Sequence, residues 1–190
     1  MNRLILASAS PRRFEILTMA GYDCTIIKPD VDETVFGTPS PADLVGELSR
    51  RKANEVAREH DGIILAADTV VALDGEILGK PKDAEDARRM LRALSDKEHW
   101  VYTGFTVCDG INSVTEVSGT KVVMRHITDD EIDAYVASNH PLDKAGAYGI
   151  QGAAGMFVSK IDGDYYTVVG LPLCRVSEIL RDTFGCTADI

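Results

Sequence analysis

Residues 63–73 read IILAADTVVAL, a run that is apolar except at Asp68 and Thr69. Apolar and polar residues do not alternate in it, so the run predicts a central strand that is buried on both faces. A buried carboxylate is costly unless it is paired, bound to a metal or neutralised. Asp68 is therefore either half of a structural ion pair or a functional group, and the strand alone favours neither.

Strand and helix signals alternate on both sides of this run. The predicted strands are Leu4–Ala7, Tyr22–Lys28, Ile63–Leu73, Glu76–Leu78, Glu98–Cys108, Val114–His126, Phe157–Ile161 and Tyr165–Val169. Helices are predicted from Ser10-Pro11 to before Gly21, from Ser40-Pro41 to about Glu59, from Asp83, from Thr128 with Glu131 as a capping box, and from Pro172 to Phe184. The stretch Asn139–Gly155 is long for a connection and predicts a functional loop. This order predicts an α/β or mixed α+β fold.

Lys52 lies at an unexpected place on the second predicted helix. The apolar residues of that helix are Leu44, Val45, Leu48 and Val56. At about 100° per residue they cover a stripe of about 120°, and Lys52 falls at about 80°, inside it. Either its alkyl stem packs while the ammonium reaches water, or the ammonium points into a cleft where anions converge.

The segment LASASPRR, residues 6–13, places two hydroxyls and two guanidinium groups where a strand meets a helix. Ser8 and Ser10 lie in the turn, and Arg12 and Arg13 lie in the first helical turn. Free N–H groups and the positive end of the helix dipole add to these charges, which suits a phosphate. An ordinary Ser-Pro cap with solvated arginines is the weaker alternative.

Two further segments carry charges that could join such a site. Gly75–Lys80 resembles a Walker loop but is one residue short, and Pro81 stands where a Mg²⁺-binding hydroxyl should be, so we reject that interpretation. Lys80 is still a cation in a turn shortly after Asp68. Glu33 lies in the acidic loop VDET, residues 31–34, which beside a phosphate site could hold a divalent cation.

The charge balance limits the class of partner. The chain has 20 Lys and Arg against 30 Asp and Glu, a formal net charge of −10. This disfavours a nucleic-acid polymer or an anionic membrane as partner. Residues 1–60 carry eight basic and nine acidic groups and are nearly neutral. A small anion neutralised by Mg²⁺ is therefore compatible with a locally basic cleft.

Size and cysteine usage limit the organisation. A chain of 190 residues with 45% hydrophobic residues predicts one domain over residues 1–190, with two lobes at most. The four cysteines are scattered without a C-x-x-C pair, which argues against a zinc cluster or a disulfide framework. The N-terminal apolar run is too short for a signal peptide, and no apolar run is long enough to span a membrane. We therefore expect a cytoplasmic location.

Taken together, these segments resemble the Maf proteins, a family of nucleotide pyrophosphatases once described as septum-formation inhibitors. The shared motifs, in chain order, are LASASPRR, VDET, RRKA, AADTVV, GKP, YTG, LDKAGAYGIQG and VVGLPL. The resemblance runs from about Leu4 to Leu180. It implies a two-lobed fold like that of the inosine-triphosphate pyrophosphatases, with a central mixed sheet flanked by helices and a cleft between the lobes.

The same resemblance implies the chemistry and the site. The expected reaction converts a nucleoside triphosphate to its monophosphate and pyrophosphate with Mg²⁺ or Mn²⁺. Asp68 matches the proton acceptor, and Glu33 matches one of the polar residues that line the cleft. Our hypothesis for the mechanism is that Glu33 with Asp68 holds the metal. The residues expected to bind the substrate are Ser8, Ser10, Arg13, Lys52 and Lys80. A homodimer is also implied.

Three positions favour a pyrimidine substrate by resemblance. Family members similar to dTTP/UTP pyrophosphatases carry Arg, Thr and Gln at positions that are Arg12, Thr69 and Gln151 here, whereas the 7-methyl-GTP group tends to carry Trp, Gln and Glu. dTTP and UTP are the expected substrates, with modified pyrimidine nucleotides and a role in cell-division arrest as further candidates. The alternatives are a purine pyrophosphatase, acting on ITP, XTP or 7-methyl-GTP, and a nucleotide-sensing regulator without turnover.

Overall fold

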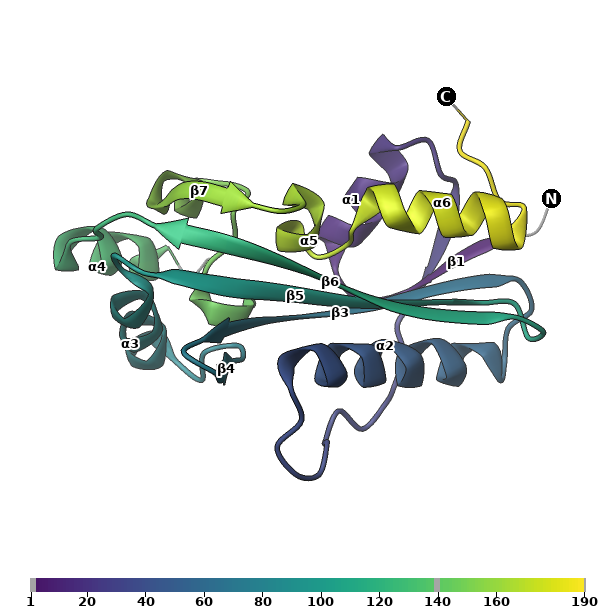
Figure 1. Cartoon of the computed structure of the whole chain (residues 1–190), viewed down its shortest axis with the longest axis horizontal. Coiled ribbons are helices and arrows are strands. Elements are labelled where there is room, and N and C mark those ends of the chain that lie inside the picture. Colours follow the sequence, from purple (N-terminus) through teal and green to yellow (C-terminus); the bar gives the residue numbers. More distant parts are fainter. Residues whose placement is uncertain (1–2, 139–140, 190) are drawn as a thin grey trace. The chain divides into compact units, whose positions relative to one another are not determined.

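The computed structural model describes residues 3–138 and 141–189 of the chain (Figure 1). The strands are β1 (Leu4–Ala7), β2 (Cys24–Ile27), β3 (Ile63–Leu73), β4 (Glu76–Leu78), β5 (Glu98–Cys108), β6 (Ser113–Met124) and β7 (Val158–Asp162). The α-helices are α1 (Pro11–Met19), α2 (Pro41–Ala57), α3 (Ala84–Leu94), α4 (Asp129–Ala137), α5 (Tyr165–Val169) and α6 (Leu173–Phe184). Two 3₁₀ turns are η1 (Ala145–Ala147) and η2 (Ala153–Phe157).

The strands of the described residues form one mixed sheet in the order β2-β1-β3-β5-β6-β7, with β4 paired to β3. β1 is parallel to both β2 and β3, and the β1–β3 register places Ala7 beside Ala66. β4 is antiparallel to β3, and β7 is antiparallel to β6. The prediction of a mixed α/β fold is therefore confirmed, and β3 is a central strand as its apolar run indicated.

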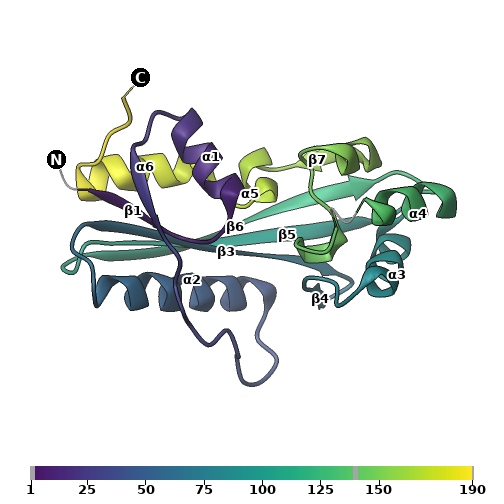
Figure 2. The ribbon, with the colours of Figure 1, turned by 180° about the vertical axis from the view of Figure 1, so that it is seen from behind.

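By its internal contacts the chain divides into two units. The first contains the described residues up to Asp68, Thr103–Ser118, and the residues from Gly170 on. In this unit α2 covers one face of the strands, whereas α1 and α6 cover the other (Figures 1 and 2). Ala53 and Val56 of α2 pack against inward-facing side chains of β1 and β3. This face of α2 is the apolar stripe that contains Lys52.

α2 lies directly on β5 at Gly104. A Cβ atom at this position would lie 2.5 Å from the carbonyl carbon and oxygen of Val45. Because glycine has no side chain, the helix backbone approaches the strand more closely than any other residue at position 104 would permit. The close approach fixes α2, and with it Lys52, against the sheet.

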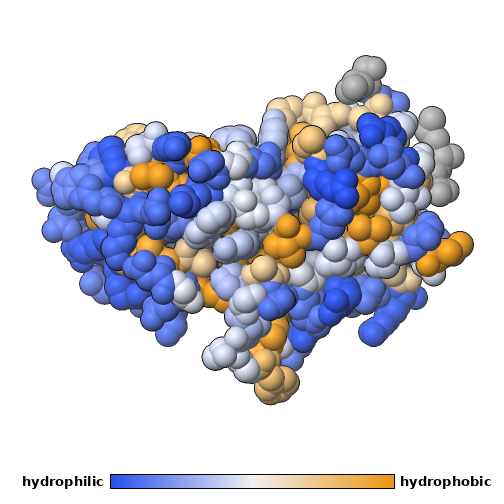
Figure 3. Space-filling view, in the orientation of Figure 1, coloured by the Kyte–Doolittle hydropathy of each residue, from blue (hydrophilic) through white to orange (hydrophobic). Residues whose placement is uncertain are grey.

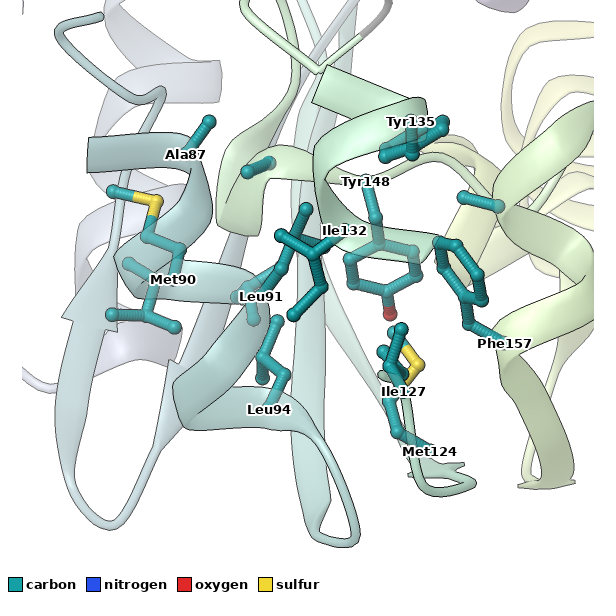
Figure 4. Close-up of a cluster of buried hydrophobic side chains, with 14 of the residues drawn as sticks. Ala87, Met90, Leu91, Leu94, Met124, Ile127, Ile132, Tyr135, Tyr148 and Phe157 are labelled. Atoms are coloured by element: carbon teal, nitrogen blue, oxygen red, sulfur yellow. The ribbon is translucent and has the colours of Figure 1, made fainter. Parts of the chain in front are cut away.

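The second unit consists of Thr69–Tyr102 and Gly119–Val169. Its core gathers side chains from α3, α4, the 3₁₀ turns and the strands, and Figure 4 shows Leu91, Ile132 and Phe157 pointing into it. The outer surface of α3 and α4 is hydrophilic (Figure 3) and carries ion pairs of Arg88 with Asp133 and of Arg92 with Asp129.

Most predicted elements are confirmed within a few residues, and one is wrong. Tyr165–Val169, predicted as a strand, is the short helix α5. The side chain of Asp164 accepts hydrogen bonds from the Thr167 amide and hydroxyl, which closes a helical turn where β-branched residues suggested a strand. The first two residues of the predicted long loop, Asn139 and His140, lie outside the described residues. No helix of the described chain is long and apolar enough to span a membrane.

Candidate active site

The candidate site is centred on Lys52, whose ammonium joins two carboxylates. Its Nζ lies 2.6 Å from Asp68 Oδ1 and 2.7 Å from Glu33 Oε1. The side chains of Lys52 and Asp68 are only 11% and 15% exposed, whereas that of Glu33 is 61% exposed. Lys52 therefore does not reach past the apolar stripe into open water. It points to anionic groups, which is the second of the two interpretations open from the sequence.

Ser8 in the β1–α1 turn and Arg13 in the first turn of α1 form a second part of the site. Buried Ser8 accepts hydrogen bonds at its Oγ from the Ser10 amide at 3.1 Å and from Arg13 Nη1 at 3.1 Å. Arg13 Nε donates to the Gly170 carbonyl at 2.8 Å. Ser8 and Gly170, both in the first unit, thus hold the guanidinium group of Arg13.

The β-sheet register explains why Ser8 and Asp68 belong to the same region. β1 ends at Ala7, which lies beside Ala66 of the parallel strand β3. Ser8 and Asp68 therefore both follow this pair in the same direction, at the carboxyl end of β1 where β3 continues. In open α/β sheets this edge is where ligands bind.

Charges from both parts of the site act on Arg13. Burial lowers the pKa of the Arg13 guanidinium, the charge of neighbouring Arg12 also lowers it, and the charges of Asp68 and Glu33 raise it in opposition. The group remains a cation at physiological pH because the ordinary pKa of arginine is so high. The first unit therefore holds Arg13 and Lys52 beside Asp68 and Glu33.

The two carboxylates suit one kind of metal site. Among the described residues, no group of three or more His, Cys, Asp or Glu side chains could hold a metal ion alone. Mg²⁺ is commonly held by one or two carboxylates together with substrate phosphates. Glu33 and Asp68 accept from the same ammonium, so their oxygens lie no farther apart than the sum of the two contact distances. They fit the protein's share of such a site.

The structure joins only some of the predicted site residues. Ser8 contacts Arg13, and Lys52 contacts both Glu33 and Asp68; all five residues belong to the first unit. Thr69, Lys80 and Gln151 belong to the second unit, where Lys80 and Gln151 are exposed, and their part in the site stays a prediction.

Ser10 differs from its expected role as a capping residue. It precedes Pro11 at the start of α1, but its side chain makes no capping hydrogen bond. Instead, the Ser10 amide donates a hydrogen bond to Ser8 Oγ, and this bond closes the turn. Its proposed contact with substrate is a separate prediction.

Sequence reasoning missed two groups that support the site. The Gly170 carbonyl, which holds Arg13, is a backbone acceptor distant in sequence, and no side-chain pattern could have identified it. Arg51 donates to backbone carbonyls on both sides of Glu33. Arg51 follows Glu47 by four residues and forms an ion pair with it. This spacing on a helix predicts such a pair, which fixes the arginine side chain.

Comparison with solved structures places the fold in a known class. The chain is similar to a HAM1 protein from Coxiella burnetii, with a TM-score of 0.54 and 16% identity, over 96% of this chain and 100% of that one. At this identity the likeness concerns the fold alone.

Sequence comparison identifies the family. A family model described as Maf-like protein matches residues 3–183, so the chain belongs to the Maf-like protein family. A dTTP/UTP pyrophosphatase of Bacillus cytotoxicus is 48% identical over 182 residues, which cover 95% of each chain. One from Geotalea uraniireducens is 49% identical over 183 residues, 95% of this chain and 94% of the relative.

Proposed function

We propose that this protein hydrolyses dTTP and UTP to the monophosphate and pyrophosphate. The names of the two relatives support the substrate class, since the likeness extends over nearly the full length of each chain. The observation that carries the chemistry is the contact of the nearly buried Lys52 with both Asp68 and Glu33. Cations and carboxylates without a catalytic Cys or His suit phosphoryl chemistry, which depends mainly on positioning and electrostatics.

Each side chain then has a defined part. Water attacks the α-phosphorus as Asp68 accepts its proton, and the bond from that phosphorus to the bridging oxygen breaks to release pyrophosphate. Arg13, Lys52 and Lys80 neutralise charge on the phosphate oxygens, while Ser8 and Ser10 bind them. Arg12, Thr69 and Gln151 select the base; the amide of Gln151 can both donate and accept, as the mixed edge of uracil or thymine requires.

Glu33 and Asp68 would hold the divalent cation, Mg²⁺ or Mn²⁺. Such an ion, when bound, supplies positive charge to the phosphate oxygens and assists in leaving-group departure. The fit rests on the two carboxylates that converge on Lys52. By family resemblance we further expect a homodimer. A cytoplasmic location, action on modified pyrimidine nucleotides and a link to cell-division arrest stay predictions.

A substrate panel tests this proposal. Pyrophosphate release is measured with Mg²⁺ and, in turn, dTTP, UTP, CTP, ITP and 7-methyl-GTP. We expect dTTP and UTP to give the highest kcat/KM. In the same assay Asp68→Asn should lower turnover by about two to four orders of magnitude, because the variant loses its proton acceptor, while circular dichroism remains that of the parent.

The other outcomes select the alternatives. A preference for ITP or 7-methyl-GTP would replace the pyrimidine assignment with a purine one. Nucleotide binding without pyrophosphate release, in Mg²⁺ and Mn²⁺ alike, would indicate a sensing protein. Near-parental turnover by Asp68→Asn would remove Asp68 from the role of base.

A further inference from the structure

The loop that carries Glu33 has little apolar anchorage. Residues 28–40 connect β2 to α2 without helix or strand and project beyond α2 (Figure 1). Phe36 is 92% exposed, and the tip of this loop forms a projection coloured from white to orange in Figure 3. Val31 and Val35 are only partly buried, and residues 32–34 between them are exposed, so polar contacts contribute to where Glu33 lies.

Arg51 supplies such contacts on both sides of Glu33. Its Nη1 donates to the carbonyl of Asp32 at 3.1 Å and to that of Thr34 at 2.9 Å. The guanidinium is itself held, because its Nε donates to Glu47 Oε1 at 2.8 Å, one turn earlier in α2. The loop contributes its own bond, from the Thr34 amide to Asp32 Oδ1 at 2.8 Å.

Successive residues of α2 therefore hold the same loop in two ways. Arg51 binds the backbone that flanks Glu33, and Lys52 binds the Glu33 carboxylate at 2.7 Å. A guanidinium can donate to two carbonyls and a carboxylate from one planar group, whereas an ammonium has a single nitrogen to do so. α2 is in turn fixed on β5 at Gly104.

We propose that Arg51 is a positioning residue, which presets Glu33 for the divalent cation before any nucleotide arrives. This inference rests on the proposed function, in which Glu33 holds the metal. When the carboxylate is already in place, metal binding does not carry the free-energy cost of ordering this ligand. Groups that orient a metal ligand typically contribute about 10- to 100-fold to metal affinity. Loss of Arg51 should therefore weaken metal binding much more than it slows turnover at saturating metal.

The test compares Arg51→Gln with Arg50→Gln. The two arginines are neighbours on α2, both pair with Glu47, and both substitutions remove one positive charge. Mn²⁺ binding to the nucleotide-free protein is measured by electron paramagnetic resonance, and backbone hydrogen exchange is measured over residues 30–36. For Arg51→Gln we expect about tenfold weaker Mn²⁺ binding and faster exchange in this segment. Arg50→Gln should match the parent in both, and Arg51→Lys should recover part of the loss.

Activity then separates positioning from catalysis. Pyrophosphate release by Arg51→Gln should need more Mn²⁺ for half-maximal rate but approach the parental kcat at saturation. Parental Mn²⁺ affinity together with parental exchange in Arg51→Gln would overturn the inference. So would an equal response of Arg50→Gln, because the effect would then be one of charge alone.

Glu33→Gln distinguishes failure of this inference from failure of the proposed function. If Glu33→Gln weakens Mn²⁺ binding while Arg51→Gln does not, the metal role stands and the positioning role fails. If Glu33→Gln binds Mn²⁺ as the parent does, the metal role of Glu33 fails, and the inference that rests on it fails with it. Faster exchange in Arg51→Gln would then show only that Arg51 orders the loop.

Discussion

His99 is a buried imidazole outside the candidate site, and it makes the stability of the protein sensitive to acid. It is 2% exposed, and its Nε2 lies 2.7 Å from the hydroxyl of Tyr148, whereas its Nδ1 has no hydrogen-bond partner among the described residues. Burial lowers the pKa of His99 from 6.5 to about 4. Because the unfolded chain binds this proton more readily, acid favours unfolding.

The sign and the pH window follow from these two pKa values. Above pH 6.5 His99 is neutral in both states and adds no pH dependence; as the pH falls from 6.5 to 4, only the unfolded state gains the proton. We expect the free energy of unfolding to fall by about 3 kcal/mol more in the parent than in His99→Phe between pH 7 and pH 4. Urea titrations at each pH measure this difference, in which carboxylates common to both proteins cancel. Parallel pH profiles would contradict the lowered pKa.

The sequence identified the candidate groups but not their contacts. The position of Lys52 within an apolar stripe and the carboxylate of Asp68 within an apolar strand were each anomalous by local rules. Their pairing depends on α2 lying against β3, which no local pattern encodes. The charge pattern around Glu33 did not by itself distinguish it from a residue of a solvated acidic loop; only the family resemblance singled it out, and the structure places it at Lys52.

The short helix α5 shows how tertiary contacts decide the structure of a short segment. Gly163 has a φ of +133°, and a Cβ there would lie 2.7 Å from the Thr120 hydroxyl. The Asp164 amide donates to the same hydroxyl at 3.0 Å, which turns the chain, and the Asp164 carboxylate then caps α5 through Thr167. β-propensity does not register the contact with Thr120, which lies on β6 and is distant in sequence.

Removal of this cap should cost stability. Asp164→Ala loses the hydrogen bonds to the Thr167 amide and hydroxyl, at 2.6 and 2.7 Å. We expect the free energy of unfolding to fall by about 1–2 kcal/mol. Asp162→Ala, an exposed aspartate two residues earlier, is the control and should change it by less than about 0.5 kcal/mol. Urea denaturation of both variants measures this, and equal effects would argue against a cap.

Longer elements were predictable because their own residues contain the signals that define them. α2 and β3 each carry enough periodic or continuous apolar residues to outweigh local exceptions, and their starts have readable signals, as when Ser40 accepts from the Asp43 amide. The capping box of Thr128 and Glu131 is likewise present as expected. The fold could thus be predicted wherever an element contains its own signals, and not where it depends on a distant neighbour.

The division into two units raises the question of whether they unfold separately. The chain passes between the units four times, and three of these passages lie inside β3, β5 and β6. If one unit unfolded alone, each of these three hydrogen-bonded strands would stay folded over only part of its length. The backbone groups where the folded part ends would lose their partners. We therefore expect one cooperative transition, in agreement with the single domain predicted from chain length.

The positions of two residue types allow a direct measurement of this cooperativity. The chain has one tryptophan, Trp100, which lies in the second unit stacked on Tyr102, with ring centroids 5.8 Å apart. The four cysteines all lie in the first unit, where Cys108 is 4% exposed and burial raises the pKa of its thiol. Tryptophan fluorescence and pulse labelling of Cys108, resolved by mass spectrometry, thus report different units along one urea titration. Coincident midpoints are expected, whereas Cys108 labelling displaced from the fluorescence change would mean that the two units unfold independently.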